Sequence, residues 1–429
     1  MRKGFLASEE ARTNAVWATF FVGLVLRLWL TREHPLASFI ASDMWVYDMR
    51  AGHLVDRPAT PWDTFTPVGY PAFLALVYRA FGKAYELIGA IGVVLGGATA
   101  ALTSLVARRV TGAPRLSLLS GALVAIHPAL ILYSGFLLTE TPSAFLLVLL
   151  VWLVLRAADD ATWGRLALAG VVLSIGIAVR PNFLLTLPAI VWFAWVRFAR
   201  DRARTLDFLR RLVACALPVL ILVCAHNTRI RGRLTGLATN GGLNFYLAHA
   251  RVSGVAFQEG SYTHRIIPIP NMIRHEARGP FVSPVPFYDE AFFYRRGLAE
   301  LLARPGEIVA SLDNVVEGVG LGKQGFWPGW KPLDASLALF AKTFAALAIV
   351  PALVWGAVLA RRGALSRVDG AGRALLFGLV LSALFTLYVF LGDPRVRVPF
   401  DPLFLVLAVE AWSRVLPRGP IRDTGDARA

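Results

Sequence analysis

The sequence predicts an all-α polytopic membrane protein with about ten transmembrane helices and two structured extracytoplasmic loops. The chain has 429 residues, is 56% hydrophobic and has a mean hydropathy of +0.58, which is more apolar than a soluble domain normally is. Its apolar residues fall in blocks close to the ~20 residues that a helix needs to cross the hydrocarbon layer. Helices are the default spanning structure because they satisfy their own backbone groups.

The apolar blocks mark the expected spans. They are residues 15–30, 87–106, 144–155, 166–179, 212–225, 337–359 and 374–391. No small-residue cleavage site follows the first block, so we expect an uncleaved first helix rather than a signal peptide. Arg27 lies inside it, where a charge at mid-bilayer would cost roughly 2.5–3.5 kcal/mol. We therefore expect this side chain to reach the interface or to face the bundle interior.

The basic residues predict the orientation. Lys and Arg number 44 against 28 Asp and Glu, for a net charge of +16. They concentrate in segments 108–115, 197–211 and 361–373, which share one side with the N-terminus if about ten spans are present, and the positive-inside rule makes that side cytoplasmic. Basic loops of this kind reflect topology and anionic lipid, so we expect membrane lipids and no nucleic acid as partners.

This topology divides the chain into three parts. Residues 1–226 form an N-terminal transmembrane module that includes a first outer loop, 31–83. Residues 227–332 form a second outer loop, and residues 333–429 form the C-terminal transmembrane helices and a short cytoplasmic tail. Both loops carry apolar and aromatic residues at helical spacing, as in 70–81, so we expect them to fold and to pack on each other over a cavity that opens to the outer leaflet.

Polar groups at the outer ends of spans are the strongest functional candidates in a membrane protein. Asp43 and Asp48 follow the first span, with a solvated acidic turn as the alternative interpretation. Five residues apart on a helix, they would project about 140° apart and would not act as a close pair. Glu140 opens a later span, where capping the helix N-terminus is the alternative.

Three arginines are expected at the same outer face. Arg180 precedes Pro181, and Arg395 and Arg397 precede Pro399. A guanidinium there can simply extend to the interface, but it is also the best side chain for holding a phosphate through two hydrogen bonds. Alternate residues of an extended stretch would direct Arg395 and Arg397 into one groove, which favours the phosphate interpretation.

Several other activities lack support in the sequence. No P-loop, G-x-S-x-G, H-E-x-x-H or paired C-x-x-C motif is present, so no motif indicates nucleotide hydrolysis or zinc-dependent hydrolysis. Cys215 and Cys224 would lie on opposite faces of one helix, so no disulfide is expected. A transporter or flippase for a lipid-linked or anionic solute is the main alternative to an enzyme. Transporters often contain inverted repeats, and the sequence has none that we detect.

The order of these features resembles bacterial GT-C glycosyltransferases of the family 39 type, which are relatives of protein O-mannosyltransferases and of lipid A aminoarabinose transferases. No matching residue is specific alone; their order, spacing and common side make the combination moderately specific. The matching residues run nearly from end to end: Arg27, Asp43, Tyr47, Ala51, Pro67 to Pro71, Phe73 to Leu76, His127-Pro128, Tyr133, Thr139-Glu140, Arg180-Pro181, His226-Asn227, Gly232, Thr239 to Gly242, Asn244 to Tyr246 and Arg395 to Pro402.

The resemblance implies a GT-C fold in the bacterial inner membrane, with the active site facing outside the cytoplasm. It implies inverting transfer of a sugar from a polyprenyl-phosphate donor to a lipid, glycan or protein acceptor. Asp43 would be the catalytic base, and Arg395, Arg397 and Arg180 would face the donor phosphate. Further candidates for substrate binding are Asp48, Tyr47, Tyr70, Glu140, Asn240 and Asn244.

Two departures from the family pattern matter. Many relatives have a second acidic residue directly after the first, where this chain has Met44. The usual paired prolines before Gly-Tyr-Pro are here Pro67 and Val68. The first departure removes a carboxylate ligand, so we expect no metal and no cofactor.

Overall fold

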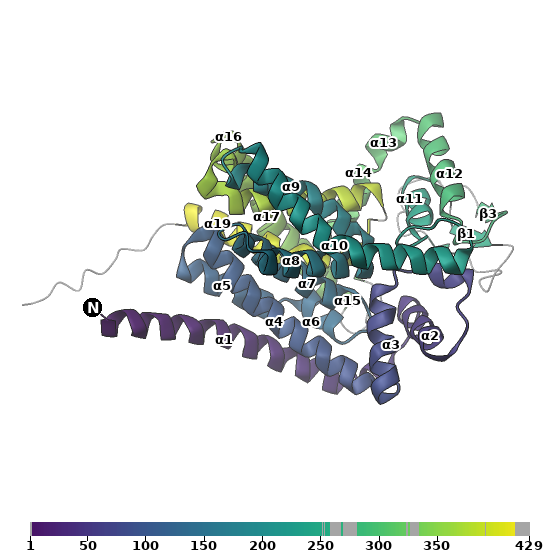
Figure 1. Cartoon of the computed structure of the whole chain (residues 1–429), viewed down its shortest axis with the longest axis horizontal. Helices are drawn as coiled ribbons and strands as arrows, with labels where there is room; N and C mark the ends of the chain where they lie inside the picture. Colours follow the sequence, from purple (N-terminus) through teal and green to yellow (C-terminus); the bar gives the residue numbers. More distant parts are fainter. Residues whose placement is uncertain are drawn as a thin grey trace, which may run out of the picture.

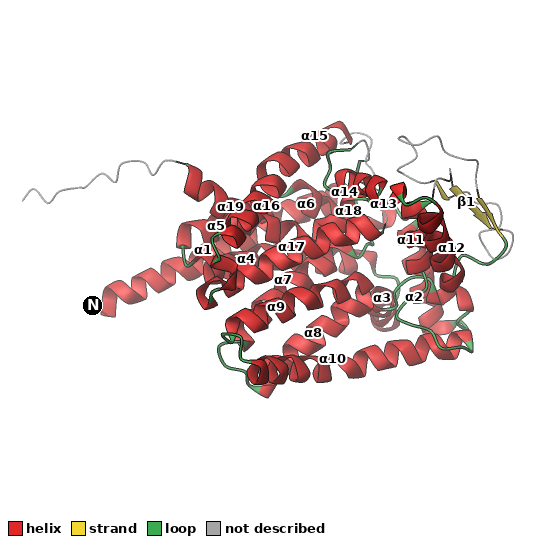
Figure 2. Ribbon diagram, turned by 90° about the horizontal axis from the view of Figure 1, so that it is seen from above, coloured by secondary structure: helices red, strands yellow, loops and turns green. Residues whose placement is uncertain are grey.

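The computed structural model describes residues 2–250, 252, 254–257, 267–268, 281–322, 325–326, 334–390 and 392–416. The described part is almost entirely helical (Figures 1 and 2), which confirms the predicted all-α fold. Part of the predicted second outer loop and most of the predicted C-terminal tail lie outside the described residues.

Apolar helices form the body of the molecule. They are α1 (Arg2–Glu33), α4 (Tyr85–Thr111), α5 (Pro114–Ala125), α6 (Pro128–Ser134), α7 (Glu140–Ala157), α8 (Trp163–Val179), α9 (Leu187–Arg197), α10 (Arg202–Arg231), α15 (Asp334–Phe344), α16 (Val350–Arg361), α17 (Ala371–Val389) and α19 (Asp401–Val415). Within the described residues, 6 helices are long and apolar enough to cross a membrane, or up to 7 if the bent pair α5 and α6 is one span. The predicted count of about ten is thus not established by length and hydropathy, because α8, α9 and α19 are shorter.

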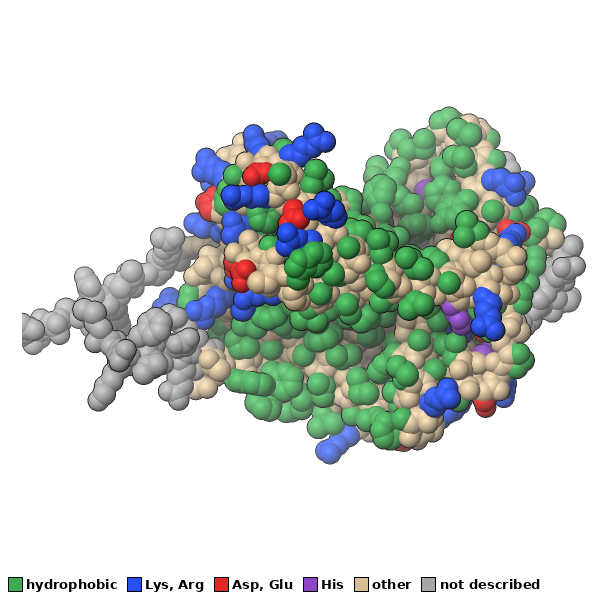
Figure 3. Space-filling model, in the orientation of Figure 1, with side chains coloured by type: hydrophobic (Ala, Val, Ile, Leu, Met, Phe, Trp, Pro, Cys, Tyr) green, Lys and Arg blue, Asp and Glu red, His purple; other side chains and the backbone are tan. Residues whose placement is uncertain are grey.

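The bundle surface is apolar in its middle and basic at one end. Figure 3 shows a broad hydrophobic belt across the molecule, with Lys and Arg gathered near the α16 end. Exposed side chains such as Phe21, Ile221 and Phe385 belong to the apolar surface. A belt of exposed apolar side chains is unfavourable in water and favourable against lipid, so this surface fits a membrane-embedded bundle.

Arg27 is fully buried on α1, which confirms the expectation that it faces the bundle interior. Its guanidinium donates to the carbonyls of Gly23 at 2.9 Å, Ala125 at 3.0 Å and Val124 at 3.4 Å. Pro128 lacks the N–H that would bond the Val124 carbonyl in a continuous helix, and α5 and α6 meet at an angle of 50°. Arg27 therefore donates to two carbonyls next to this bend.

The two outer loops form a folded cap at the other end of the bundle. The first loop contains η1 (Leu36–Ser38), α2 (Asp43–Asp56), η2 (Pro61–Thr64) and α3 (Gly69–Phe81). The second contains α11 (Gly241–His249), β1 (Gly254–Phe257), β2 (Ile267–Pro268), β3 (Phe281–Ser283), α12 (Glu290–Ala303), α13 (Gly306–Ala310) and α14 (Leu312–Gly318). Strand β1 is central, antiparallel to β2 and parallel to β3. Short turns complete the fold: η3 (Pro181–Thr186), the π-helical turn η6 (Ala345–Ile349), η7 (Ala364–Ser366), η8 (Val368–Gly370), α18 (Pro394–Arg397) and η9 (Val398–Phe400).

The predicted packing of the two outer loops on each other is confirmed. Phe287 of the second loop contacts Phe65 and Trp62 of the first, with ring centroids 4.7 Å and 6.0 Å apart. The backbone N–H of Thr239 also donates to the carbonyl of Thr64 at 2.9 Å. Aromatic pairs of this kind add to the burial of apolar area, so the cap is held by its own small core.

Gly69 controls how closely α3 approaches α8. A Cβ at this position would lie 2.5 Å from the carbonyl carbon of Ala178 and 2.6 Å from the nitrogen of Val179. These are backbone atoms, so relief requires a helix to move. We expect Gly69→Ala to lower the free energy of unfolding by about 1–3 kcal/mol, measured by thermal unfolding in detergent. Gly52→Ala on α2 is the matched control, since a Cβ there meets nothing within 4 Å; equal losses in both variants would contradict the packing argument.

Candidate active site

Asp43 is the first residue of α2, where a negative charge is favoured by the helix dipole. Its Oδ2 lies 2.6 Å from Nη2 of Arg395, and its side chain remains 39% exposed. The preceding residue, Ser42, has a φ of 51°, a backbone region that L side chains rarely adopt. The start of α2 therefore presents a carboxylate that is both held by an arginine and open to solvent.

Arg395 reaches Asp43 because of the local structure of α18. The Asp393 carboxylate accepts a hydrogen bond from the Arg395 backbone N–H at 2.9 Å, and Pro394 occupies the first helical position. A capping acid followed by proline favours a helical turn at this point. Arg395 Nε also lies 3.4 Å from Oε1 of Glu140. One guanidinium thus connects acids from α2 and α7.

Glu140 is the first residue of α7 and is 1% exposed. It pairs with Arg180, which follows α8 and also donates from Nε to the Thr139 hydroxyl at 2.7 Å. Glu140 therefore joins two arginines instead of only capping its helix, and its Oε2 is buried without a hydrogen-bond partner among the described residues. We call Asp43, Glu140, Arg180 and Arg395 the outer charge cluster.

Two tyrosines line the outer charge cluster. Tyr47 is one helical turn after Asp43, and its ring contacts the ring of Tyr70 at 5.4 Å. Burial, together with the nearby Asp43 charge, raises the pKa of Tyr47 to about 12. Burial likewise raises the pKa of Tyr70. Both phenols remain protonated at neutral pH, so both can donate hydrogen bonds to a ligand.

Asp48 lies on a different face of α2 and acts as an anchor. Its carboxylate accepts hydrogen bonds from the Tyr78 hydroxyl at 2.6 Å, the Tyr85 hydroxyl at 2.8 Å and Lys83 Nζ at 2.7 Å. Burial alone would raise the pKa of Asp48, but the bonds from Lys83, Tyr78 and Tyr85 outweigh it and hold the pKa below its usual value. The side chain connects α2 to α3 and α4.

The lowered pKa of Asp48 predicts a pH-dependent contribution to stability. A carboxylate with a depressed folded-state pKa stabilises above the unfolded pKa of about 3.9 and loses that effect as pH falls through its folded pKa. We expect Asp48→Asn to cost about 1–3 kcal/mol at neutral pH, with the difference from the unaltered protein narrowing below about pH 4. Thermal unfolding of the unaltered protein and the Asp48→Asn variant across this pH range measures the difference in stability. A difference that stays constant with pH would contradict the proposed role of the ionised Asp48 carboxylate.

The expected pairing of Arg395 with Arg397 in one groove differs from the observed geometry. Arg397 is fully buried, donates to the Val319 carbonyl at 2.7 Å and lies 2.8 Å from Oδ1 of Asp401. The expectation assumed an extended stretch, whereas α18 is helical, and residues two apart on a helix point about 200° apart. Arg397 therefore ties α18 to α14 and α19.

Asn240 and Asn244 belong to the cap rather than to the outer charge cluster. They are half-buried residues at the start of α11. The buried side chains of this helix, including Tyr246, pack with Phe287 and Phe293 of the second loop. The structure therefore places these two amides in the folded second outer loop.

Sequence reasoning missed a second polar group on α2. Arg50 is 1% exposed, and its guanidinium donates to the hydroxyl and carbonyl of Thr66. Close by, the Asp63 carboxylate lies 2.8 Å from His53 Nδ1. Arg50 follows Asp43 by seven residues, a spacing that returns to the same helix face, and this spacing could have identified it.

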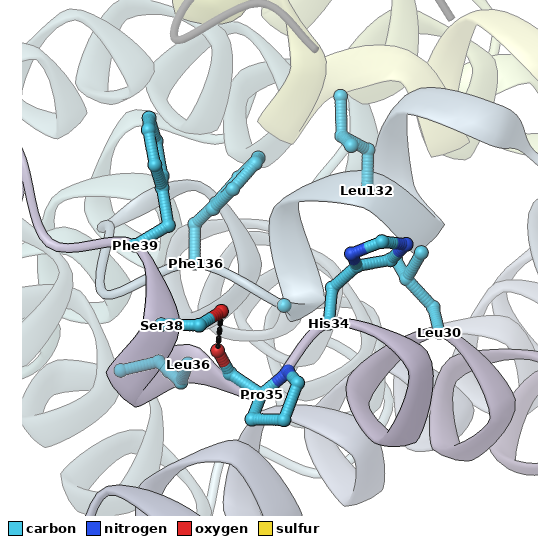
Figure 4. Close-up of a pocket in the computed structure, with 9 residues that line it drawn as sticks. Leu30, His34, Pro35, Leu36, Ser38, Phe39, Leu132 and Phe136 are labelled. Carbon is cyan, nitrogen blue, oxygen red and sulfur yellow. Dashed lines mark hydrogen bonds between the residues drawn. The ribbon is translucent and has the colours of Figure 1, made fainter. Parts of the chain in front are cut away.

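A mainly apolar pocket of ≈ 260 Å³ lies at the outer end of α1. Figure 4 shows Phe39 and Phe136 together on one wall, with Leu30 and His34 on another. Phe136 also contacts Tyr133, with ring centroids 6.3 Å apart. Tyr133 in turn lies within electrostatic interaction distance of Glu140. Within the described part of the chain, no group of three His, Cys, Asp or Glu residues is placed to hold a metal ion.

The fold and the site together define a polytopic helical membrane protein in which an arginine–carboxylate cluster connects α2 of the folded cap to the bundle. Residues 66–226 match the family model described as dolichyl-phosphate-mannose-protein mannosyltransferase, which covers well under half of the chain. The matched region includes Tyr70, Glu140 and Arg180 but neither Asp43 nor Arg395. A search of curated proteins gives no significant match.

Among solved structures, the fold is similar to that of the Archaeoglobus fulgidus oligosaccharyltransferase in complex with Zn and sulfate. The TM-score is 0.52 at 15% sequence identity, over 94% of this chain and 49% of that chain, so this chain spans about half the length of the oligosaccharyltransferase. A likeness at this identity concerns the fold alone. The family match over residues 66–226 and this likeness in fold agree with the resemblance that the sequence shows to GT-C glycosyltransferases.

Proposed function

We propose that this protein transfers a sugar from a polyprenyl-phosphate donor to a hydroxyl acceptor outside the cytoplasm. The observation that carries the proposal is the outer charge cluster, in which a 39% exposed carboxylate meets a guanidinium at 2.6 Å. An acceptor hydroxyl is a weak nucleophile that needs a base, and the leaving lipid phosphate is an anion that needs cations. The cluster offers both groups at one place.

In the proposed reaction, Asp43 takes the proton of the acceptor hydroxyl while the oxygen of that hydroxyl bonds to the anomeric carbon of the sugar. The bond from that carbon to the phosphate oxygen breaks from the opposite face, which inverts the centre and releases polyprenyl phosphate. Arg395 and Arg180 stabilise the negative charge of the departing phosphate, so the proposed reaction uses no metal ion. The protonated phenols of Tyr47 and Tyr70 are proposed donors to sugar hydroxyls.

The ion pair between Asp43 and Arg395 suggests an order of events. Without donor, the Arg395 guanidinium donates a hydrogen bond to Oδ2 of Asp43. An arriving phosphate competes for the same guanidinium, which frees Asp43 to take a proton. The base is then available mainly when the donor is present. The pocket lined by Phe39 and Phe136 is the proposed contact for the first isoprenoid units, because it is mainly apolar and its Phe136 packs against Tyr133.

The decisive experiment is transfer by the purified protein in nanodiscs. A panel of polyprenyl-phosphate sugars and hydroxyl acceptors is supplied, and release of polyprenyl phosphate is followed with product formation. Cleavage of donor only when acceptor is present supports the proposal. Movement of intact donor across proteoliposomes without cleavage would instead identify the transporter or flippase that the sequence left as the alternative.

The proposed site faces outward from a bacterial inner membrane. The argument is the positive-inside rule applied to the basic segments 197–211 and 361–373. Reporters fused after Arg204, in α10 near its start, and after Leu234, which is 93% exposed beyond the end of α10, should report the inside and the outside respectively. Both reporters on one side would overturn the topology and the proposed location of the site.

A further inference from the structure

A large groove lies at the end of the bundle opposite the cap, between α16, α17 and α19. Its volume is ≈ 1150 Å³. One part is apolar and the other is basic, and we call it the basic-end groove. Its apolar part includes Val350, Val354, Val358 and Val415. It is separate from the outer charge cluster, and none of its lining residues has a role in the proposed transfer.

A buried carboxylate holds the walls of the basic-end groove together. Glu410 of α19 is 1% exposed and accepts from Arg373 Nη2 of α17 at 2.7 Å. It also accepts from Trp355 Nε1 of α16 at 3.2 Å. One acid therefore links all three helices, and its charge is balanced by Arg373. The indole N–H of Trp355, which lines the groove, is therefore hydrogen-bonded.

Trp412 is held by a backbone carbonyl that proline leaves open. In a regular helix the Leu347 carbonyl would accept from the N–H of residue 351, but that residue is Pro351 and has no N–H. Trp412 Nε1 donates to this carbonyl at 2.8 Å instead. The contact falls in the π-helical turn η6, a feature frequent at functional sites. Tryptophans with a bonded N–H and an apolar ring are typical of the membrane interface.

The rim of the groove is positively charged. Arg362, Arg367 and Arg414 are exposed lining residues, and Asp369 is the acid beside them. Because Arg373 is already paired with Glu410, these three arginines leave an excess of positive charge at the rim. Basic pockets between transmembrane helices bind the headgroups of anionic lipids. A free phosphate would use the rim alone and leave the apolar wall empty.

We propose that the basic-end groove binds an anionic phospholipid. An acyl chain lies along Val350 and Val354, and the phosphate is held by the rim arginines Arg362, Arg367 and Arg414. The charge excess at the rim and the continuity of apolar wall and basic rim in one cavity favour this occupant over a second copy of the chain or over its own residues 417–429.

Native mass spectrometry of the full chain with phosphatidylglycerol or phosphatidylcholine tests the proposal. Each rim arginine should contribute about fivefold to binding, so a triple variant, Arg362→Ala with Arg367→Ala and Arg414→Ala, should lose most of the preference for phosphatidylglycerol. The matched control replaces by Ala three exposed arginines, Arg200 before α10 and Arg202 and Arg204 in its first turn, and should keep the preference. Val354→Trp, which fills the apolar wall, should weaken binding with all arginines present.

Four results would overturn the lipid assignment. Equal losses in the two triple variants would show a diffuse charge effect without a site. Binding by the unaltered protein that does not distinguish the two lipids would remove the role of the rim. Lipid binding that occurs only after residues 417–429 are deleted, or a rim variant that changes the oligomeric state without changing lipid binding, would assign the groove to another occupant.

Discussion

Replacing Asp43 by Asn should reduce sugar transfer by about 10²–10⁴-fold, since that is what a general base typically contributes. Asparagine keeps the size of the side chain and most of its hydrogen bonding but cannot accept the acceptor's proton. Folding should be nearly unchanged, because this side chain is 39% exposed. Donor affinity should be equal or higher, since Arg395 no longer has a carboxylate to hold. Initial rates of transfer and a separate donor-binding assay measure the two effects.

Two further aspartates of α2 make this result interpretable. Asp56→Asn, at the exposed end of the same helix, is the matched control and should retain full activity. Asp48→Asn should lower the stability of the protein and not its transfer activity, because the Asp48 carboxylate accepts hydrogen bonds from Tyr78, Tyr85 and Lys83. An active Asp43→Asn with an inactive, folded Asp48→Asn would exchange the two roles. Activity in both would refute the proposed mechanism.

Replacing Arg395 by Ala should raise the KM for the donor about ten- to a hundredfold, because a charge-assisted hydrogen bond contributes about 1.5–3 kcal/mol. Arg395→Lys should recover part of this loss, since lysine keeps the charge but cannot form the bidentate contact. Arg180→Ala should act in the same direction. Steady-state kinetics over a range of donor concentrations measures the change, and Arg79→Ala, an exposed arginine on α3, is the control.

Arg397→Ala should behave differently from Arg395→Ala. The side chain is fully buried and pairs with Asp401, so its removal leaves a buried carboxylate without its partner. Breaking a buried ion pair typically costs about 3–5 kcal/mol, so this variant should fail by instability and poor expression. A stable Arg397→Ala protein with a raised donor KM would return Arg397 to the phosphate site and contradict the geometry of α18.

Local patterns in the sequence predicted much of the fold. The helical spacing in residues 70–81 corresponds to α3. The five-residue separation of Asp43 and Asp48 also predicted their divergence on α2, which the separate partners of the two side chains bear out. These features depend on neighbours along the chain, and helical periodicity is therefore enough to reveal them.

The number of spans was harder to predict, because helix length and burial depend on packing. Helices α8, α9 and α19 have 17, 11 and 15 residues, fewer than the ~20 that cross the hydrocarbon layer, so their length does not identify them as spans. The direction of Arg397 was missed for a local reason. Asp393 and Pro394 are a capping acid and a first-turn proline, and together they indicate a helical turn where an extended stretch was assumed.

The sequence by itself determined that this protein is helical, membrane-embedded and basic at one end, because apolar run length and charge distribution are properties of the chain. Only the tertiary structure decided which polar groups meet. Asp43 and Arg395 are 352 residues apart, and Glu140 and Arg180 come from two further helices. Periodicity shows which face of a helix is polar, but the partner of that face is set by how the helices pack. The charges of the outer charge cluster therefore meet only in the folded bundle.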